Sequence, residues 1–166
     1  DVFSVADTVS KADGGTFDGN VTMAGTLATT GNATFSGEII TSTSGLSNVR
    51  IGENAGDALA SGGNENVLVG DEAGTALTTG DDNVAIGYRA LSTEDTGTRS
   101  VAIGHDALRV QNNDSTNYNV AVGFGAGEAV TTGVQNTLIG GSSGDAITTA
   151  NSNSALGYNS LGATTT

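Results

Sequence analysis

Short apolar triplets recur along the chain at almost constant spacing, each preceded by a polar residue and followed by glycine. The copies begin 18, 17, 17, 19, 17 and 17 residues apart. They read NVRIG (48–52), NVLVG (66–70), NVAIG (83–87), SVAIG (100–104), NVAVG (119–123), NTLIG (136–140) and NSALG (153–157). A fixed period of this length is typical of a solenoid, in which one short unit stacks on its neighbours and builds a continuous core.

Within each unit, branched residues alternate with a smaller one, as in Val84, Ala85 and Ile86, and this period of two predicts a strand. The glycine after the triplet indicates a turn in which a Cβ atom would clash with a stacked backbone. These predicted structural turn positions are Gly52, Gly70, Gly87, Gly104, Gly123, Gly140 and Gly157. We expect each unit to form one coil of about two short strands, with coils about 4.8 Å apart.

The second half of the unit has two forms. Units of the first form continue with x-x-Ala/Ser-Gly-x-Ala and then Leu, Val or Ile, as in Ala73-Gly74-Thr75-Ala76-Leu77. Units of the other form continue with x-x-Ala/Ser-Leu, as in Ala90-Leu91. A polar turn rich in Thr, Gly and Asn then leads to the next unit.

The two faces of each strand differ in the size of their side chains. The central residue, Arg50, Leu68, Ala85, Ala102, Ala121, Leu138 or Ala155, is mostly small and apolar, and branched residues flank it. A strand that is apolar on both faces is covered on both faces. Since a thin coil can hold only one row, we expect the Val/Ile row to fill the coil and the Ala row to pack against another chain.

The repeats resemble the head repeats of trimeric autotransporter adhesins, known as the YadA-like head. The resemblance rests on the S/N-V-A-I-G unit followed by x-x-Ala, and it covers residues 48–166, which is 119 of 166 residues. It implies a left-handed parallel β-roll assembled as a homotrimer, either intertwined or side by side. The longer period, with ALTTGDDN (76–83) before the next strand, is more similar to repeats in bacteriophage tail fibres.

Weaker patterns precede these repeats and divide the chain into three segments. The sequence TFDGNVT (16–22) returns 18 residues later as TFSGEII (34–40) and is similar to shaft segments of phage fibres. Residues 14–46 are therefore expected to form a short β-rich fibre shaft of two 18-residue units, and residues 47–166 the β-roll. Residues 1–13 place apolar side chains at coiled-coil spacing and are expected to be a short coiled coil or a disordered leader.

Composition and charge exclude several classes of protein. The chain has 26 Gly, no Pro, no Trp and only four Phe and three Tyr, so its side chains cannot build a large globular core. It has no Cys, which excludes a disulfide framework. No apolar run of about 18 residues is present, so membrane insertion is not expected. The net charge of -13 repels nucleic acid.

Several motifs could suggest a cofactor, a metal or catalysis, but their positions in the repeat explain them as structural features. The sequence GFGAG (123–127) lacks the spacing of a dinucleotide-binding loop. Acidic turns such as Asp81-Asp82 are interpreted as solubilising, with divalent cation binding as the alternative. The Asn residues that precede the strands predict a stacked amide ladder. The sequence Ile-Gly-x-x-Ala also fits one hexapeptide of the left-handed helices in trimeric acyltransferases. In those enzymes the pattern recurs every six residues, and in this chain it does not. We therefore expect no cofactor, no metal site and no catalytic residue.

Two surface features are candidates for receptor contact. Aromatic residues follow the strand-ending glycine in some units, where they can stack on one another or on sugars. The coil that begins at Ser100 has 19 residues, and its excess lies in RVQNNDSTNY (109–118), either a neutral insertion or a binding loop. The predicted contact residues are Tyr88, Phe124 and Tyr158 in the first set and Arg109, Gln111, Asn112, Asn113 and Tyr118 in the second. His105 shares the aromatic position and is expected to be peripheral.

These observations predict a homotrimeric structural fibre protein at the surface of a virion, such as a phage tail fibre. The expected partners are other fibre or baseplate proteins and a glycan or protein of the host cell surface, bound weakly but with avidity. A bacterial trimeric surface adhesin is the main alternative. A polysaccharide-cleaving tailspike that uses surface carboxylates and an ice-binding solenoid with a Thr column are lesser alternatives.

Overall fold

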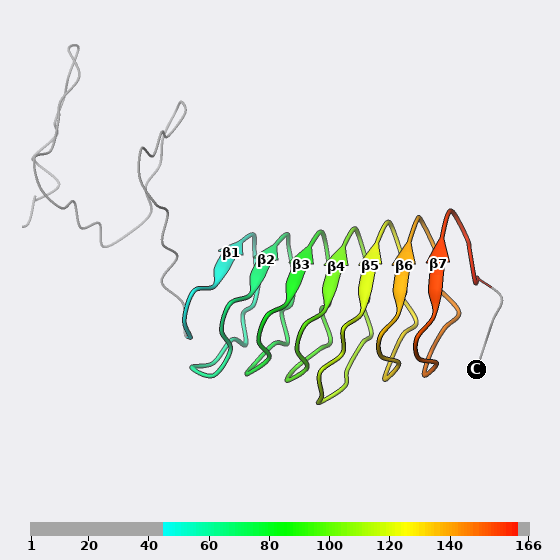
Figure 1. Cartoon of the computed structure of the whole chain (residues 1–166). Helices are drawn as coiled ribbons and strands as arrows, with labels where there is room; N and C mark the ends of the chain where they lie inside the picture. Colours follow the sequence, from blue (N-terminus) through cyan, green and yellow to red (C-terminus); the bar gives the residue numbers. More distant parts are fainter. Residues whose placement is uncertain (1–44, 163–166) are drawn as a thin grey trace, which may run out of the picture. The chain divides into compact units, whose positions relative to one another are not determined.

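A computed structural model describes residues 45–162 of the chain (Figure 1). Seven short strands form one parallel sheet in sequence order. They are β1 (Val49–Ile51), β2 (Val67–Val69), β3 (Val84–Ile86), β4 (Val101–Ile103), β5 (Val120–Val122), β6 (Thr137–Ile139) and β7 (Ser154–Leu156). Equivalent residues of successive units are paired, as Ala85 is with Ala102. The predicted all-β parallel solenoid is confirmed. The predicted leader (1–13), shaft segment (14–46, apart from its last two residues) and residues 163–166 lie outside the described residues.

Each described coil contains one strand rather than the two expected. After the strand, the chain passes through consecutive turns in which Arg89 and Leu91 have φ angles of 54° and 53°. This left-handed conformation interrupts the extended backbone that a second strand requires. Hydrogen bonds between coils nevertheless continue there, for example from Leu91 N–H to the Ala107 carbonyl at 3.0 Å. The turns therefore stack as regularly as the strands do.

The central residue of each strand, and not the Val/Ile row, faces the inside of the coil. Ala85 and Ala102 are fully buried, whereas Val84 and Ile86 are only half-buried. The predicted orientation of the two rows is therefore wrong. The reason is that in coils such as that of Leu91 a large side chain enters the narrow interior from the turn, which leaves room for only a small residue on the strand.

The two forms of the repeat are two ways of filling the same interior. A Cβ atom on Gly74 would lie 2.7 Å from Leu68 Cδ2 and 2.9 Å from Leu77 Cδ1, so those two leucines occupy the space beside that glycine. Where the strand residue is Ala85 or Ala102, the glycine is replaced by a buried leucine at position 91 or 108. Close packing thus couples the strand to the turn in these coils, whereas beside Gly127 the space is filled by Leu108 and Leu138 of the adjacent coils.

The predicted amide ladder runs along the start of the strands. Asn83 is fully buried, its Oδ1 accepts the backbone N–H of Ser100 at 2.9 Å, and its Nδ2 donates to the Gly97 carbonyl at 2.9 Å. Asn66 and Asn136 make the equivalent bonds to their own turn and to the next coil. Each amide therefore ties its own coil closed and links it to the following coil.

The glycine that ends each strand combines an unusual backbone conformation with a close approach. Gly87 has a φ angle of 126°, and a Cβ atom there would lie 2.6 Å from the Gly104 carbonyl oxygen. Both the conformation and the stacking exclude a side chain at this position.

Candidate functional site

The outer face of the sheet is uncharged along all seven strands and apolar at every position except Thr137 and Ser154. Its positions are Val or Ile in β1 to β5, Thr137 and Ile139 in β6, and Ser154 and Leu156 in β7. Ile51 is 59% exposed and Leu156 is 81% exposed. No charged residue stands at these positions, although the chain carries a net charge of -13. Because parallel sheets are normally covered on both faces, this surface is a candidate interface with another polypeptide.

A second exposed column follows the strand-ending glycines. The ring centroids of Tyr88 and His105 lie 5.0 Å apart with a 47° tilt, and those of His105 and Phe124 lie 4.9 Å apart with a 20° tilt. The spacing matches the rise from coil to coil, because each ring comes from the same position of successive coils. Tyr88, Phe124 and Tyr158 are 40%, 64% and 84% exposed. These three predicted contact residues therefore lie on the surface in one column.

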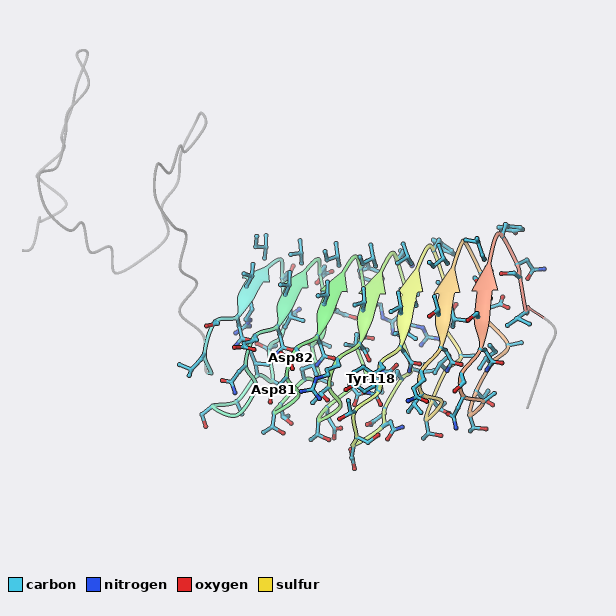
Figure 2. All side chains as sticks on the ribbon, viewed as in Figure 1. Asp81, Asp82 and Tyr118 are labelled. Atoms are coloured by element: carbon cyan, nitrogen blue, oxygen red, sulfur yellow. The ribbon has the colours of Figure 1, made fainter. Side chains whose placement is uncertain are left out.

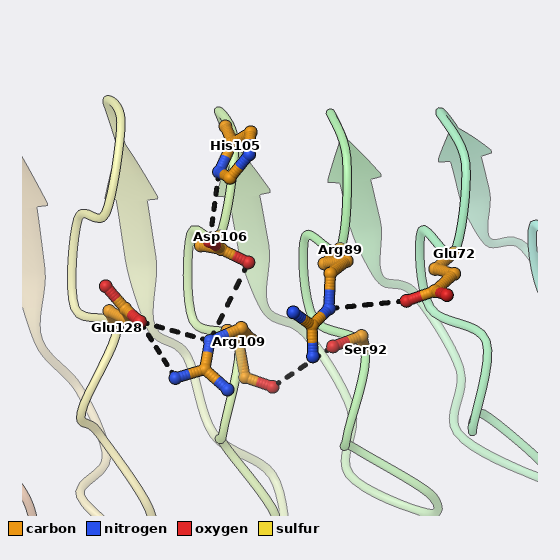
Figure 3. Close-up of polar contacts among 7 residues, drawn as sticks. All are labelled: Glu72, Arg89, Ser92, His105, Asp106, Arg109 and Glu128. Atoms are coloured by element: carbon orange, nitrogen blue, oxygen red, sulfur yellow. Dashed lines mark hydrogen bonds and ion pairs between the residues drawn. The ribbon is translucent and has the colours of Figure 1, made fainter.

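Ion pairs between adjacent coils run beside this aromatic column (Figure 3). Arg89 Nε lies 3.3 Å from Glu72 Oε2 of the preceding coil. Arg109 Nη2 donates to Glu128 Oε1 of the following coil at 2.8 Å. Partly exposed pairs of this kind add little stability, but they fix where the charges stand. Arg109, a predicted contact residue, is therefore half-buried and engaged.

His105 is also paired within its own coil. Its Nδ1 lies 3.0 Å from Asp106 Oδ2, and Asp106 Oδ1 lies 3.7 Å from Arg109 Nε (Figure 3). In residues 45–162, no group of three His, Cys, Asp or Glu side chains is placed to hold a metal ion. The histidine thus belongs to the surface column and its ion-pair border.

The 19-residue coil carries a turn between β4 and β5 that extends beyond the other turns (Figure 1). Asn112 is exposed and Asn113 is half-buried, with its Nδ2 donating to the Thr132 carbonyl at 2.8 Å. Gln111 is fully buried, contrary to the prediction of a receptor contact. The surface of this loop is therefore limited to its tip and to Tyr118, which is 52% exposed.

A buried carboxylate holds this loop from inside. Glu94 is fully buried, and its Oε1 accepts the Gly97 N–H at 2.9 Å. Its Oε2 accepts hydrogen bonds from Gln111 Nε2 at 2.9 Å and from Asn117 Nδ2 at 3.0 Å. The N–H of Asn113 approaches both oxygens at 3.3 and 3.4 Å. The equivalent position of other coils holds Leu59, Leu77, Val130 or Ile147. The coil of Glu94, which begins at Asn83, therefore has a hydrogen-bonding carboxylate where those four coils have an apolar side chain.

Gln111 also bridges the one break in the amide ladder. Ser100 stands where the other coils carry Asn, and Gln111 Nε2 donates to its Oγ at 2.8 Å. Gln111 Oε1 accepts a hydrogen bond from Asn119 Nδ2 at 2.7 Å. Sequence reasoning missed this network. A signal was available in the sequence. Ser100 interrupts the Asn row, and Glu94 and Gln111 replace the apolar turn residue in the same two neighbouring coils.

Tyr118 belongs to a different column, which precedes the strands. The Arg99 guanidinium lies 5.9 Å from the Tyr118 ring centroid, and its Nε lies 3.3 Å from Asp82 Oδ2. Figure 2 places Asp81, Asp82 and Tyr118 at the turns that lead into the strands. The predicted contact residues therefore fall on two separate parts of the coil surface.

The described part of the chain contains no helix that is long and apolar enough to cross a membrane. Comparison of the chain with protein-family models, with curated proteins and with solved structures finds no match.

Proposed function

We propose that this chain is a structural fibre protein of a virion, such as a phage tail fibre, whose solenoids assemble as a homotrimer and attach to a host cell surface. The observation that carries the proposal is the outer sheet face of an acidic chain, which is uncharged in seven successive coils and wholly apolar in the first five. A long exposed apolar strip of this kind is typical of an interface, and in homo-oligomers the same strip serves every copy.

The copies are proposed to pack side by side rather than to intertwine. One chain supplies the whole buried cluster of the described coils, including Leu68, Leu91, Leu108 and Leu138. No exchange of segments is needed to complete a coil. Because the outward row is Val/Ile, it is this row, and not the Ala row, that would meet the other copies.

The position of the acidic residues supports the same arrangement. Asp81 and Asp82 stand at the turns, away from the outer sheet face (Figure 2). A trimer closed along the apolar face would keep these carboxylates in water, where their repulsion is screened. The acidic turns would also prevent further association. In this proposal the protein is extracellular, is not an enzyme, and binds neither nucleic acid nor membranes.

The attachment surfaces are the aromatic column and the exposed tip of residues 109–118. Since Glu94 anchors the loop through Gln111 and Asn117, little ordering entropy remains to be lost on binding. Contacts of low affinity suffice, because three copies on each fibre act together. Other fibre or baseplate proteins are the expected partners at the ends of the segment.

Immunogold electron microscopy tests the proposal. Antibodies raised against the purified chain and applied to the particles that carry it are expected to label a thin appendage. Label on a capsid shell would contradict the proposal. Label on a bacterial envelope would contradict it in favour of the trimeric surface adhesin.

A further inference from the structure

The aromatic column leaves two of its rings uncovered. His105 stacks on one side of Phe124. The next coil has Gly141 at this position, so no side chain of the column covers the other side of Phe124. Phe124 is 64% exposed, against 40% for Tyr88, and Tyr158 in the last described coil is 84% exposed. Gly141 therefore leaves one face of Phe124 open, and the Tyr158 ring lies beside Gly141 in the following coil.

The backbone does not require glycine at position 141. Its φ angle is not positive, and a Cβ atom would meet Tyr158 Cδ2 at 3.4 Å and Cε2 at 3.7 Å, which are ordinary contacts. Other coils carry Asp71, Tyr88 or His105 at the same position. The backbone conformation therefore does not explain the missing side chain, and its absence leaves one face of Phe124 open beside the Tyr158 ring.

Hydrogen-bonding groups lie next to Gly125, the residue that follows Phe124. A Cβ atom on Gly125 would lie 3.5 Å from Glu128 Oε2 and 3.8 Å from Ser142 Oγ, so both oxygens stand beside the residue that follows Phe124. Arg109 holds Glu128 through Oε1, which leaves Oε2 for another donor. An open aromatic face with oxygens beside the next residue of the chain suits a pyranose, whose C–H face can stack on the ring while its hydroxyls reach the polar groups.

Local charge selects among saccharides. Glu128 and Asp145 occupy equivalent positions of adjacent coils, and the whole chain has a net charge of -13. An acidic sugar would bring its carboxylate towards these carboxylates, and the repulsion would weaken binding. A neutral sugar meets no such penalty.

The composition of the column does not fit an interface between copies. Its members are Glu53, Asp71, Tyr88, His105, Phe124, Gly141 and Tyr158, which differ in charge and size from coil to coil. An interface formed by stacked repeats keeps one character along its length, as the outer sheet face does by carrying no charge in any described strand. The irregular column is better suited to a ligand that contacts only a few coils.

We propose that Phe124, Gly141 and Tyr158 form a binding site for a neutral pyranose of a host-surface glycan, with Ser142 and Glu128 as hydrogen-bonding partners. The site deepens the proposed attachment function and rests on it for the source of the glycan. Its residues lie in three adjacent coils of one chain, so each copy carries a complete site.

Saturation-transfer NMR on the full chain tests this site. The probes are methyl β-glucoside, methyl β-galactoside, methyl α-mannoside and N-acetylglucosamine, with glucuronic acid and N-acetylneuraminic acid as acidic counterparts. At least one neutral probe is expected to receive saturation, and the acidic probes less. Phe124→Ala removes one ring face and is expected to weaken binding about tenfold.

Gly141→Phe is the decisive variant, because it fills the missing position of the column and covers the Phe124 face. It is expected to lose binding about tenfold while its melting temperature stays at or above that of the wild type. The matched controls are Gly141→Ala, which adds only a methyl group, and Asp57→Ala, which removes an exposed carboxylate outside the aromatic column and the 109–118 loop. Both are expected to bind within about twofold of the wild type.

The site is overturned if no neutral probe binds, if acidic probes bind better, or if Phe124→Ala and Gly141→Phe both bind like the wild type. Light scattering on the same samples separates this result from the fibre proposal. A trimer that binds no probe would refute only the sugar site. A monomer that binds a neutral probe through Phe124 would support the site and contradict the trimer.

Discussion

Replacing Glu94 with Ala is expected to destabilise the solenoid strongly, although the position is apolar in other coils. The carboxylate accepts three hydrogen bonds of 2.9 to 3.0 Å, from Gly97, Gln111 and Asn117, in a fully buried site. Alanine would leave these three donors without an acceptor. The loop of residues 109–118 would lose its anchor at the same time.

The magnitude follows from the number of orphaned donors. Each buried donor without a partner costs about 1–3 kcal/mol. Removing one member of a buried charged network costs about 3–5 kcal/mol. We expect a loss of unfolding free energy in this second range, because water can relieve part of the total. For a chain of this size, that loss corresponds to a fall in melting temperature of about 6–20 °C.

Thermal unfolding followed by circular dichroism measures this effect. Glu94→Gln keeps the shape and one acceptor oxygen, so its melting temperature should fall between those of Glu94→Ala and the wild type. Glu53→Ala removes an exposed carboxylate and is the control, with an expected change within about 0.5 kcal/mol. If Glu94→Ala melted together with Glu53→Ala, the buried network would not anchor the loop.

Three further changes test other parts of the structure. Gly87→Ala should destabilise more than Gly157→Ala, because both glycines have a φ angle above 120° but only Gly87 is stacked against another backbone; equal melting temperatures would refute the steric argument. Asn83→Ala removes both buried bonds of one ladder amide and should cost about 2–4 kcal/mol in unfolding free energy, and a loss below 1 kcal/mol would contradict its role. Ile103→Asp places a charge on the outer sheet face and should reduce the molecular mass in light scattering, whereas an unchanged mass would exclude that face as the interface.

The sequence predicts the strands and their register because the period leaves one arrangement. With Asn, Val and Gly at fixed positions every 17 to 19 residues, only stacking in phase pairs Val84 with Val101 and aligns the strand-ending glycines. The amide ladder follows from the same alignment. These features depend on repetition, which a single sequence displays fully.

The inward face could not be predicted in the same way. Side-chain size along the strand suggests that Ile86 is inside and Ala85 outside, and the opposite is true because Leu91 and Leu108 fill the coil from the turns. The burial of Gln111 could not be predicted either, since it depends on a hydrogen bond to Glu94, which lies 17 residues earlier in the chain. Both outcomes depend on contacts between coils rather than on local pattern.

The molecular mass of the purified chain in dilute solution tests the central claim most directly. Size-exclusion chromatography with light scattering should give three times the 16.3 kDa mass of one chain, since the outer sheet face needs other copies to cover it. A folded species with the mass of a single chain would contradict the claim that this face joins the copies of a fibre.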